Sequence, residues 1–410
     1  MNIYLVVTIL ITLSAVFAYL NQKFLRLPFV IGLFLISTVL SLIVLSSKYW
    51  LNVPLDYITG QVESLHIEKV IIDYLLGFLL FAGALHTDWK SIQKNVRAIS
   101  VFAVAGVMVS TVIIAFLTYF VSHLFNVSID FISCLLFGAL ISPTDPIAVL
   151  GGILTKANVS KHIESTIVGE SLFNDGIGVV VFLALLQSKT SGVFSVELFS
   201  TLFFQEAIGG VILGIIFGYV LHMLLKSIDH YETEILLTIA FVMSGYWVCN
   251  VLHTSGALAM VVMGLMTGNF KQNLAMSDTT QEYVHKFWEL VDVILNAILF
   301  LLIGFILLII EIEFNHLLFG LITIIIVLVS RFVVVYIPIF SASKFIGLKP
   351  RDGLILTWGG LRGGLSIALV LSLPQSEIKN VLLIITYCCV LFSIIIQGLT
   401  IQKLAKSNAV

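Results

Sequence analysis

The sequence predicts an all-α polytopic membrane protein with about thirteen transmembrane helices, on three observations. Hydrophobic residues make up 59% of the 410 positions and charged residues only 11%, whereas soluble domains carry about 25% charged residues. The mean hydropathy is +1.11. The apolar residues also fall into segments of roughly the 20 residues that a helix needs to cross a bilayer. A soluble fold is therefore excluded.

Short connections join the thirteen predicted spans. The spans are residues 3–20, 28–46, 68–85, 98–122, 130–154, 164–187, 198–225, 233–249, 251–268, 286–309, 314–340, 352–374 and 380–402. We expect the first span to be retained, because it lacks the basic start and the small-residue cleavage site of a signal peptide. The four cysteines lie within apolar segments and do not have the spacings of zinc or redox motifs. Since no connection is long enough for a soluble domain, function should lie within the bilayer.

The basic residues predict the orientation of the chain. Lys and Arg gather in short cytoplasmic loops of membrane proteins. With the N-terminus outside and the C-terminus in the cytoplasm, fifteen of the 21 Lys and Arg residues lie at inner ends and four at outer ends, leaving Arg331 and Arg362 within the membrane. We expect a bacterial cytoplasmic (inner) membrane. The lipid bilayer is the expected partner, and neither nucleic acid nor a cofactor is expected.

Three charged side chains are predicted to lie near the middle of the membrane. Counted from the cytoplasmic end of its span, Asp145 lies 9 residues in, Asp175 lies 11 in and Arg362 lies 10 in. At about 1.5 Å per residue, all three lie roughly 14–17 Å deep in a core of ~30 Å. Charges at this depth cost at least ~2.5–3.5 kcal/mol and usually mark an ion pathway or an ion pair. We therefore expect one polar cluster at the midplane.

Two of these charges lie where a continuous helix is disfavoured. Asp145 belongs to Ser-Pro-Thr-Asp-Pro at 142–146, and its two prolines remove backbone hydrogen bonds. Arg362 belongs to Gly-Gly-Leu-Arg-Gly-Gly at 359–364, where four glycines weaken the helix. The fifth and twelfth spans run in opposite directions, and paired interruptions of this kind indicate inverted repeats with crossed discontinuous helices. Exposed helix N-termini favour a carboxylate such as Asp145, and exposed C-termini favour a cation such as Arg362.

The acidic residues of the cluster are expected to differ in role. Asp145 and Arg362 have a structural interpretation, in which they neutralise each other and the helix ends. Asp175 is a second midplane carboxylate, one more than Arg362 alone can neutralise, so we favour direct ion chemistry for it. Glu170 lies five residues nearer the cytoplasm. We expect it to form a structural ion pair with Arg362.

Further polar residues lie in the tenth and eleventh spans. Glu289, Asp292 and Asn296 are spaced i, i+3 and i+7, which places them on one helix face near the cytoplasmic end. They either line a cytoplasmic funnel that attracts cations or form a solvated or ion-paired helix end. Arg331 needs a carboxylate partner, for which Asp292 and Glu164 are candidates. We interpret Arg331 as structural.

At these motifs the sequence resembles the cation:proton antiporter-1 family, the sodium/proton exchangers of the NhaP type. The resemblance covers nearly the whole chain. It rests on four motifs in order: Ser-Pro-Thr-Asp-Pro at 142–146, Gly-Glu-Ser-Leu-Phe-Asn-Asp-Gly at 169–176, Phe-Trp-Glu-Leu-Val-Asp at 287–292 and Trp-Gly-Gly-Leu-Arg-Gly-Gly at 358–364. One of these motifs alone would be weak, but four in order on the expected helices are a specific signal.

The resemblance implies the sodium/proton antiporter fold, in which a core bundle moves against a homodimerising scaffold. On this basis residues 1–95 would hold the first scaffold helices, which contribute to dimerisation, and 96–190 the first half of the core bundle. Residues 191–310 would hold a linker helix and the second scaffold helices, and 311–410 the second half of the core.

The resemblance also implies roles for the site residues. Asp175 would be the titrating ligand of the transported sodium ion, with Asn174 beside it and further oxygens from Ser171 and Thr144, while Asp145 would balance the crossing. Because Asn does not titrate, one carboxylate would hold either a proton or a monovalent cation. We therefore expect electroneutral one-for-one exchange by alternating access, with sodium, lithium or potassium as the cation. The Glu170–Arg362 pair would be structural.

One position departs from the pattern of many relatives. They carry Glu after a Leu-Phe pair in the third span, but Ala82 follows Leu80 and Phe81 here. Three other functions compete with sodium/proton exchange. A potassium/proton antiporter would use the same site, and a cation channel could also use interrupted helices and acidic residues. An intramembrane aspartyl protease would use Asp145 and Asp175, but its Gly-x-Gly-Asp motif is absent from the sequence.

Overall fold

The computed structural model describes residues 3–51, 56–63, 65–125, 127–145, 159–191, 196–269, 277–310 and 313–408. Each of the thirteen predicted spans corresponds to helix in this part of the chain. The first seven correspond to α1 (Ile3–Leu20), α2 (Phe29–Leu51), α5 (Leu76–Leu85), α6 and α7 (Trp89–Ser100 and Val107–Leu124), α8 (Phe131–Ile141), α10 (Lys161–Thr190) and α11 (Val196–Lys226). The other six correspond to α12 (Tyr231–Val251), α13 (Gly256–Gly268), α14 (Asp278–Phe305), α15 (Phe314–Ser341), the pair α17 and α18 (Pro350–Trp358 and Gly364–Leu371), and α19 with α20 (Glu377–Phe392 and Gly398–Asn408).

Several helices contain a change of winding or are short. Turns of π-helix occupy Asn21–Leu25, Val70–Leu75, Val101–Gly106 and Ser393–Gln397, and a 3₁₀ turn occupies Ile306–Leu308. The short helices α3 (Asp56–Glu63), α4 (Ile67–Lys69) and α16 (Ser343–Ile346) lie in or beside connections. Within the described residues, nine helical stretches are long and apolar enough to cross a membrane, and α8 and α13 are shorter apolar helices.

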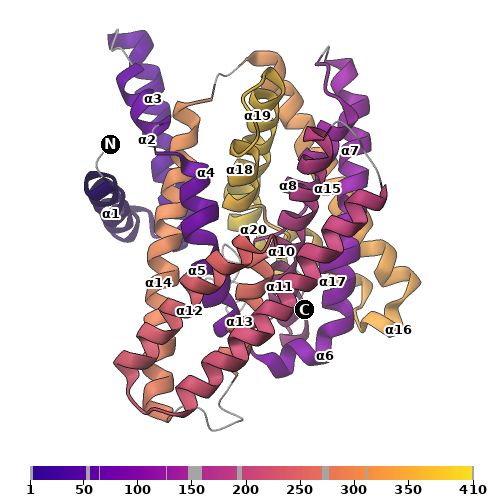
Figure 1. Cartoon of the computed structure of the whole chain (residues 1–410). Helices are drawn as coiled ribbons and strands as arrows, with labels where there is room; N and C mark the ends of the chain where they lie inside the picture. The colour runs from indigo at the N-terminus through magenta and orange to yellow at the C-terminus, as the bar shows by residue number, and fades with distance from the viewer. Residues whose placement is uncertain are drawn as a thin grey trace.

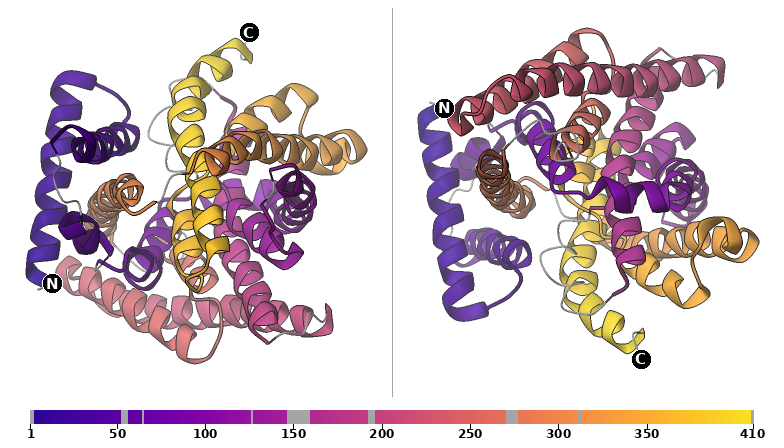
Figure 2. Two further views of the ribbon diagram at one scale, coloured as in Figure 1. Left: turned by 90° about the horizontal axis from the view of Figure 1, so that it is seen from above. Right: turned by 90° about the horizontal axis from the view of Figure 1, so that it is seen from below.

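Most helices run roughly along one direction, so the termini of the spans lie at two ends of the molecule (Figure 1). Seen from above or below, α2 and α14 lie on one side and α15 on the other, with the C-terminal helices between them and α11 with α12 along one edge (Figure 2). The helix α1 is an exception, because it crosses α2 and α14 at a steep angle. Its apolar surface is largely exposed, with Tyr4 78% and Tyr19 60% accessible.

The packing follows two groups of helices. In one group, α2 packs against α14, and α5, α11 and α12 each pack against α13. In the other group, α8 packs against α7, and α10 packs against both α6 and α8. Helices α15 and α18 each pack against α19. Within the chain, α6 begins at Trp89 and continues as helix into α7. The expected boundary at 95/96 therefore falls inside a helix.

The twelfth span is unwound as predicted. Its helix ends at Trp358, and α18 begins at Gly364. The fifth span is also interrupted, because α8 ends at Ile141 and residues 142–145 are not helical. Residues 146–158, including Pro146 and the predicted second part of this span, lie outside the described residues.

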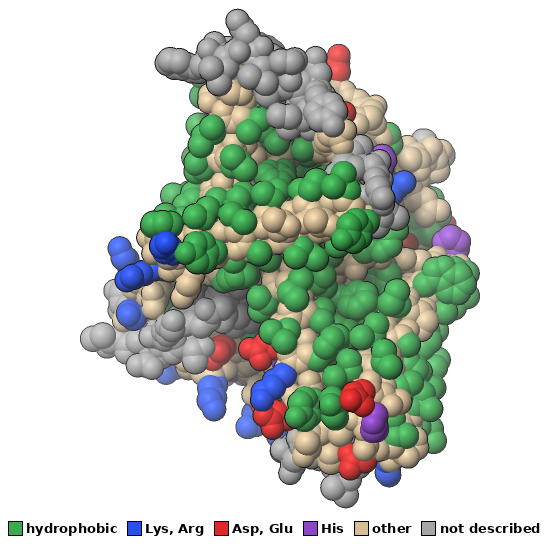
Figure 3. Space-filling view, turned by 90° about the vertical axis from the view of Figure 1, so that its left-hand side faces the viewer, with side chains coloured by type: hydrophobic (Ala, Val, Ile, Leu, Met, Phe, Trp, Pro, Cys, Tyr) green, Lys and Arg blue, Asp and Glu red, His purple; other side chains and the backbone are tan. Residues whose placement is uncertain are grey.

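The surface supports a membrane location. The face on the left-hand side of Figure 1 is covered mainly by hydrophobic side chains, and its Lys and Arg side chains gather toward the lower part of the molecule (Figure 3). An apolar band bordered by basic side chains is typical of an integral membrane protein.

Candidate ion-binding site at the helix crossing

The two interrupted segments contact each other through their backbones. The amide of Asp145 donates a hydrogen bond of 2.8 Å to the carbonyl oxygen of Leu361. This bond joins the end of the interrupted fifth span to the middle of the unwound twelfth span. Because lipid offers no hydrogen-bond partners, unwound backbone is tolerated at this depth only where protein satisfies it.

Two residues of the last span satisfy further backbone groups of the unwound segment. Ser393 accepts a hydrogen bond of 2.7 Å from the amide of Arg362, and Gln397 donates one of 3.1 Å to the carbonyl oxygen of Trp358. Both side chains are buried, and they are the first and last residues of a π-helical turn. The π turn therefore holds the unwound segment at both of its ends, which agrees with the frequent use of such turns at functional sites.

The two charges of the interrupted motifs lie at opposite helix ends, as predicted. Arg362 donates to the carbonyl oxygens of Ser142 and Pro143, just after the C-terminus of α8, and the bond to Pro143 is 2.8 Å long. Asp145 packs against Gly363, the residue before α18, so closely that a Cβ at this position would overlap the Asp145 carboxylate. The cation thus lies at a helix C-terminus and the carboxylate at a helix N-terminus, where each is stabilised by the helix dipole.

The predicted ion pair between Glu170 and Arg362 is wrong. Glu170 instead binds Arg331 of α15: Nη1 contacts Oε1, and Nη2 donates to Oε2 over 2.9 Å. Arg331 also donates to the carbonyl oxygen of Leu356 over 3.0 Å. Neither Asp292 nor Glu164 is therefore its partner. A planar guanidinium binds a carboxylate with two parallel bonds, which makes this a specific buried pair.

Three of the predicted ligand residues form one hydrogen-bonded group. Thr144 Oγ1 lies 3.0 Å from Ser171 Oγ and accepts a bond of 2.9 Å from the amide nitrogen of Asn174. The amide oxygen of Asn174 accepts from the backbone N–H of Thr144 over 3.3 Å. All three side chains are at most 2% exposed. Asn174 therefore holds the interrupted segment against α10 with both ends of its amide.

Asp175 differs from these neighbours. Its side chain is only partly buried. Within the described residues it interacts electrostatically with Asp145 and Arg362, but no hydrogen bond to its carboxylate is present there. The arginines that could neutralise it are already bound to Glu170 and to the end of α8. Among the acidic side chains at the crossing, Asp175 is therefore one whose carboxylate is available to bind a small cation or a proton.

The predicted polar face of α14 extends from this region. Asp292 is half-buried and interacts electrostatically with Asp145, while Glu289 is exposed. Asn296 is 2% exposed and donates to the backbone carbonyl of Asp292 over 2.9 Å. The side chains therefore become more buried along the face, from Glu289 toward Asn296.

The position that departs from many relatives, Ala82, lies in α5. Ala82 is fully buried in α5. At the next residue, Gly83, an added Cβ would lie 3.9 Å from Leu172 of α10, which follows Ser171. This chain has no carboxylate at position 82.

Comparisons with known proteins show the family to which the chain belongs. The chain matches the family described as sodium/hydrogen exchanger, transmembrane, over residues 11–407. It is 44% identical to the Na(+)/H(+) antiporter NhaP of Pseudomonas aeruginosa over 403 residues, which cover 97% of this chain and 95% of that protein. The chain belongs to the sodium/hydrogen exchanger family. As a member of this family it is an integral membrane protein of the antiporter type.

Other members of the family extend the comparison. The Na(+)/H(+) antiporter NhaH of Halobacillus dabanensis is 34% identical to this exchanger over 357 residues, 85% of each chain. The solved structure of the sodium proton antiporter MjNhaP1 from Methanocaldococcus jannaschii at pH 8 covers 97% of this chain and 96% of its own, with a TM-score of 0.76 and 17% identity. This likeness confirms the predicted sodium/proton antiporter fold.

The sequence-based prediction assigned one partner wrongly and missed two residues of the crossing. Arg331 was expected to be structural, but its partner Glu170 was assigned to Arg362. Ser393 and Gln397 were not singled out, although two polar residues spaced i, i+4 in an apolar span are a signal of a buried contact. That signal does not say which backbone groups they bind.

Proposed function

We propose that this exchanger carries sodium in exchange for protons, with Asp175 holding either one proton or one cation during alternating access. The observation that supports this most strongly is the state of the Asp175 carboxylate. It is partly exposed and has no hydrogen bond within the described residues, whereas the neighbouring charges bind partners. Ser171 and Thr144 are the neighbouring side-chain oxygens that would complete the ion's ligands.

The balance of charge around the crossing supports exchange of one ion for one. Glu170, Asp145 and Asp175 carry three negative charges, against the two positive charges of Arg331 and Arg362. One proton or one monovalent cation at Asp175 makes this group neutral. An unloaded site would carry an uncompensated charge through a low-dielectric region, which is costly. Only the two loaded forms would then cross, and the exchange would be electroneutral.

The cytoplasmic route is proposed to follow the polar face of α14. Glu289 is exposed and Asp292 lies nearer the site, so the two carboxylates would attract cations toward Asp145 and Asp175. We also propose a bacterial inner membrane with the N-terminus outside and the C-terminus in the cytoplasm, and a homodimer formed through the scaffold helices.

The proposal is tested by proton flux in proteoliposomes after addition of sodium, lithium, potassium or choline. We expect flux with sodium and none with choline. Asp175→Asn keeps the shape of the side chain and removes its titration, so this variant should fold and lose exchange. As a control, Asp130→Asn changes a carboxylate that lies before α8 and binds Lys189 and Ser133. Exchange by Asp175→Asn at a rate close to that of the unchanged protein would refute the proposal.

Potassium/proton exchange and channel activity are outcomes of the same assay. Proton flux that responds to potassium and not to sodium would assign the alternative cation. Cation flux that proceeds without proton movement would assign a channel.

A further inference from the structure

A groove of about 520 Å³ opens on the surface of the molecule beside α6. Its walls come from the end of α6, the π turn Val101–Gly106 and α16, and both α6 and α16 lie toward the lower end of the molecule in Figure 1. Val104 and Ala105 of the turn line the groove, and Val104 is 40% exposed. Exposed apolar surface of this kind on an integral membrane protein marks contact with lipid.

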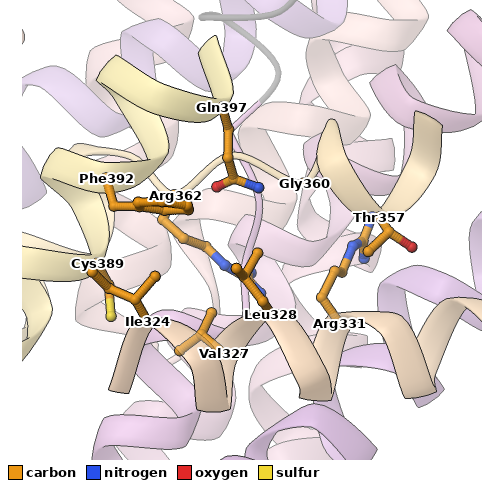
Figure 4. Close-up of a pocket in the computed structure, with 10 residues that line it drawn as sticks. All are labelled: Ile324, Val327, Leu328, Arg331, Thr357, Gly360, Arg362, Cys389, Phe392 and Gln397. Atoms are coloured by element: carbon orange, nitrogen blue, oxygen red, sulfur yellow. The ribbon is translucent and has the colours of Figure 1, made fainter. Parts of the chain in front are cut away.

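This groove is separate from the candidate ion site. Figure 4 shows the small cavity beside the crossing, with Arg331, Arg362 and Gln397 around it. The groove and that cavity have no lining residue in common. The π turn packs against α15 through Gly106, where an added Cβ would lie 3.2 Å from Val334. A ligand in the groove would therefore contact α6, the π turn and α16, and none of the residues that line the cavity.

The end of the groove that α6 forms is polar. Arg97 and Ser100 line it about one helical turn apart, and both are exposed. The guanidinium of Arg97 lies 5.1 Å from the centre of the Phe345 ring, a position in which a cation is attracted to the aromatic face. None of the ion pairs formed within the described ranges includes Arg97. An aromatic ring therefore holds this charge in place, and the charge is available to an anion.

The exposed face of α6 is basic along its length. Lys90, Lys94 and Arg97 are spaced i, i+4 and i+7, which places them on one side of the helix, while Ile92 and Ile99 are buried on the other. The predicted span begins at residue 98, directly after Arg97. This charge therefore lies where lipid headgroups meet the apolar core of the bilayer. Helices with a basic face at this level attract anionic lipids.

His162 of α10 holds two walls of the groove together. Its Nδ1 contacts Oδ1 of Asn95 in α6, and its Nε2 lies 3.1 Å from the carbonyl oxygen of Gly347. Gly347 ends α16 in the left-handed conformation, with a φ of 75°, two residues after Phe345. The wall that carries Phe345 is thus tied to the helix that carries Arg97, so the groove is formed before a ligand arrives.

We propose that this groove binds one anionic phospholipid from the surrounding membrane. The phosphate of the headgroup accepts hydrogen bonds from the guanidinium of Arg97 and the hydroxyl of Ser100, and an acyl chain lies along Val101, Val104 and Ala105. Basic pockets between transmembrane helices bind anionic headgroups in this way. The planar guanidinium can form two parallel hydrogen bonds with a phosphate, which adds specificity.

The polar end and the apolar walls together favour this ligand over others. A zwitterionic lipid would fit the apolar walls, but its ammonium group would bring another cation beside Arg97 and Lys94. A free phosphate ion would meet the same basic side chains, but it would gain nothing from the apolar walls. The inference concerns a lipid at the surface, and it does not depend on which cation the exchanger carries.

The first test is native mass spectrometry of the full-length protein in detergent, titrated with phosphatidylglycerol or with phosphatidylcholine of the same acyl chains. The unchanged protein should hold one phosphatidylglycerol molecule more tightly than phosphatidylcholine. Arg97→Gln should weaken this binding about fivefold, the usual effect of one basic residue at an anionic lipid surface. Lys23→Gln is the matched control and should bind as the unchanged protein does. Lys23 is also exposed and lies 5.4 Å from the ring centres of Tyr19 and Phe24, but it does not line the groove.

The second test fills the groove and leaves every charge in place. Ala105→Trp puts a large ring against the apolar wall, so it should also weaken the binding of phosphatidylglycerol. Ala105 is exposed, so the larger side chain needs no space in the core. Equal affinity of Ala105→Trp and the unchanged protein for phosphatidylglycerol would overturn the proposal, as would equal affinity of the unchanged protein for the two lipids. Displacement of the lipid by inorganic phosphate alone would overturn it in favour of a free anion.

Discussion

The guanidinium of Arg331 binds both carboxylate oxygens of Glu170, and the two residues are 6% and 1% exposed. Removal of one partner from such a pair leaves an uncompensated buried charge. Glu170→Gln should therefore lower the free energy of unfolding by about 3–5 kcal/mol. Thermal unfolding of the purified protein in detergent measures this loss, together with the yield of folded protein.

A double-mutant cycle distinguishes the observed pair from the one expected from the sequence. Glu170→Gln combined with Arg331→Gln should cost less than the sum of the two single changes, because both ends of one interaction are lost together. The same cycle with Arg362→Gln should be closer to additive, since Arg362 binds the end of α8. A larger coupling energy with Arg362 than with Arg331 would contradict the structure.

The sequence predicted which charges gather at the crossing, but not how they pair. Depth along a helix placed Asp145, Asp175 and Arg362 at one level, and the residue types predicted which helix ends Asp145 and Arg362 approach. Arg331 and Arg362 lie at nearly the same predicted depth, so depth does not decide between them as partners of Glu170. The choice depends on where the bundle places α15 relative to α10, which is a property of the whole fold.

At the scale of the element, α10 approaches the interrupted segment very closely at Gly178. A Cβ at this position would overlap the ring of Pro143. The ring cannot turn away, because the carbonyl of Pro143 is bound to Arg362. Gly178→Ala should therefore destabilise the protein by about 1–3 kcal/mol, the usual cost of overpacking, and should also slow exchange. Thermal unfolding and proton flux measure the two effects.

Gly83→Ala is the matched control for this substitution. It also changes a helical glycine, but the nearest atom to the added Cβ would be 3.9 Å away. Alanine is the better helix former, so this variant should be as stable as the unchanged protein or slightly more stable. Equal behaviour of the two alanine variants would show that the approach of Pro143 to α10 is looser than described.

The cap of α6 gives a prediction about pH. Asp88 precedes this helix and accepts bonds from the hydroxyl of Ser91 over 2.7 Å and from the amide of Lys90 over 3.0 Å. The bond from Ser91, more than any other contact, lowers the pKa of Asp88. The unfolded chain then binds more protons, so the stabilisation is present above the ordinary pKa of ~3.9 and is lost as pH falls through the lowered value.

Thermal unfolding as a function of pH measures this contribution. Asp88→Ala should cost about 1 kcal/mol near neutral pH, with a smaller cost in acid. Asp88→Asn should keep the cap hydrogen bonds, but residue 88 should no longer contribute to the change of the free energy of unfolding with pH. A constant difference between Asp88→Ala and the unchanged protein at all pH values would argue against the cap.

Hydropathy predicted the spanning helices of this bundle, but not the short helices α3 and α16, because span length and apolar content are local properties of the sequence. The interruptions were predictable for a similar reason, since Pro143 and the glycines at 359–364 disfavour helix directly. The π turn at Ser393–Gln397 and the steep angle of α1 were not predictable. Both depend on contacts with other helices, and residues 380–402 read as one continuous apolar span.

At the scale of the whole molecule, the central claim is that one carboxylate carries one proton or one sodium ion. Asn174, beside Asp175, holds Thr144 and does not titrate. If protons and sodium compete at Asp175, the apparent affinity for sodium should weaken by about tenfold per pH unit below the midpoint of Asp175 protonation. The measurement is proton flux against sodium concentration, with the same pH on both sides of the membrane. An affinity that does not change with pH would mean that the two ions bind at separate sites.

The most direct test of the central claim is sodium uptake into proteoliposomes under a membrane potential, with equal pH on both sides. One-for-one exchange moves no net charge, so a potential alone should not drive uptake, whereas an imposed pH gradient should. The account predicts the same initial rate with the potential inside-negative, zero or inside-positive. Sodium uptake that rises with an inside-negative potential would show that net charge crosses the membrane, and would contradict the account.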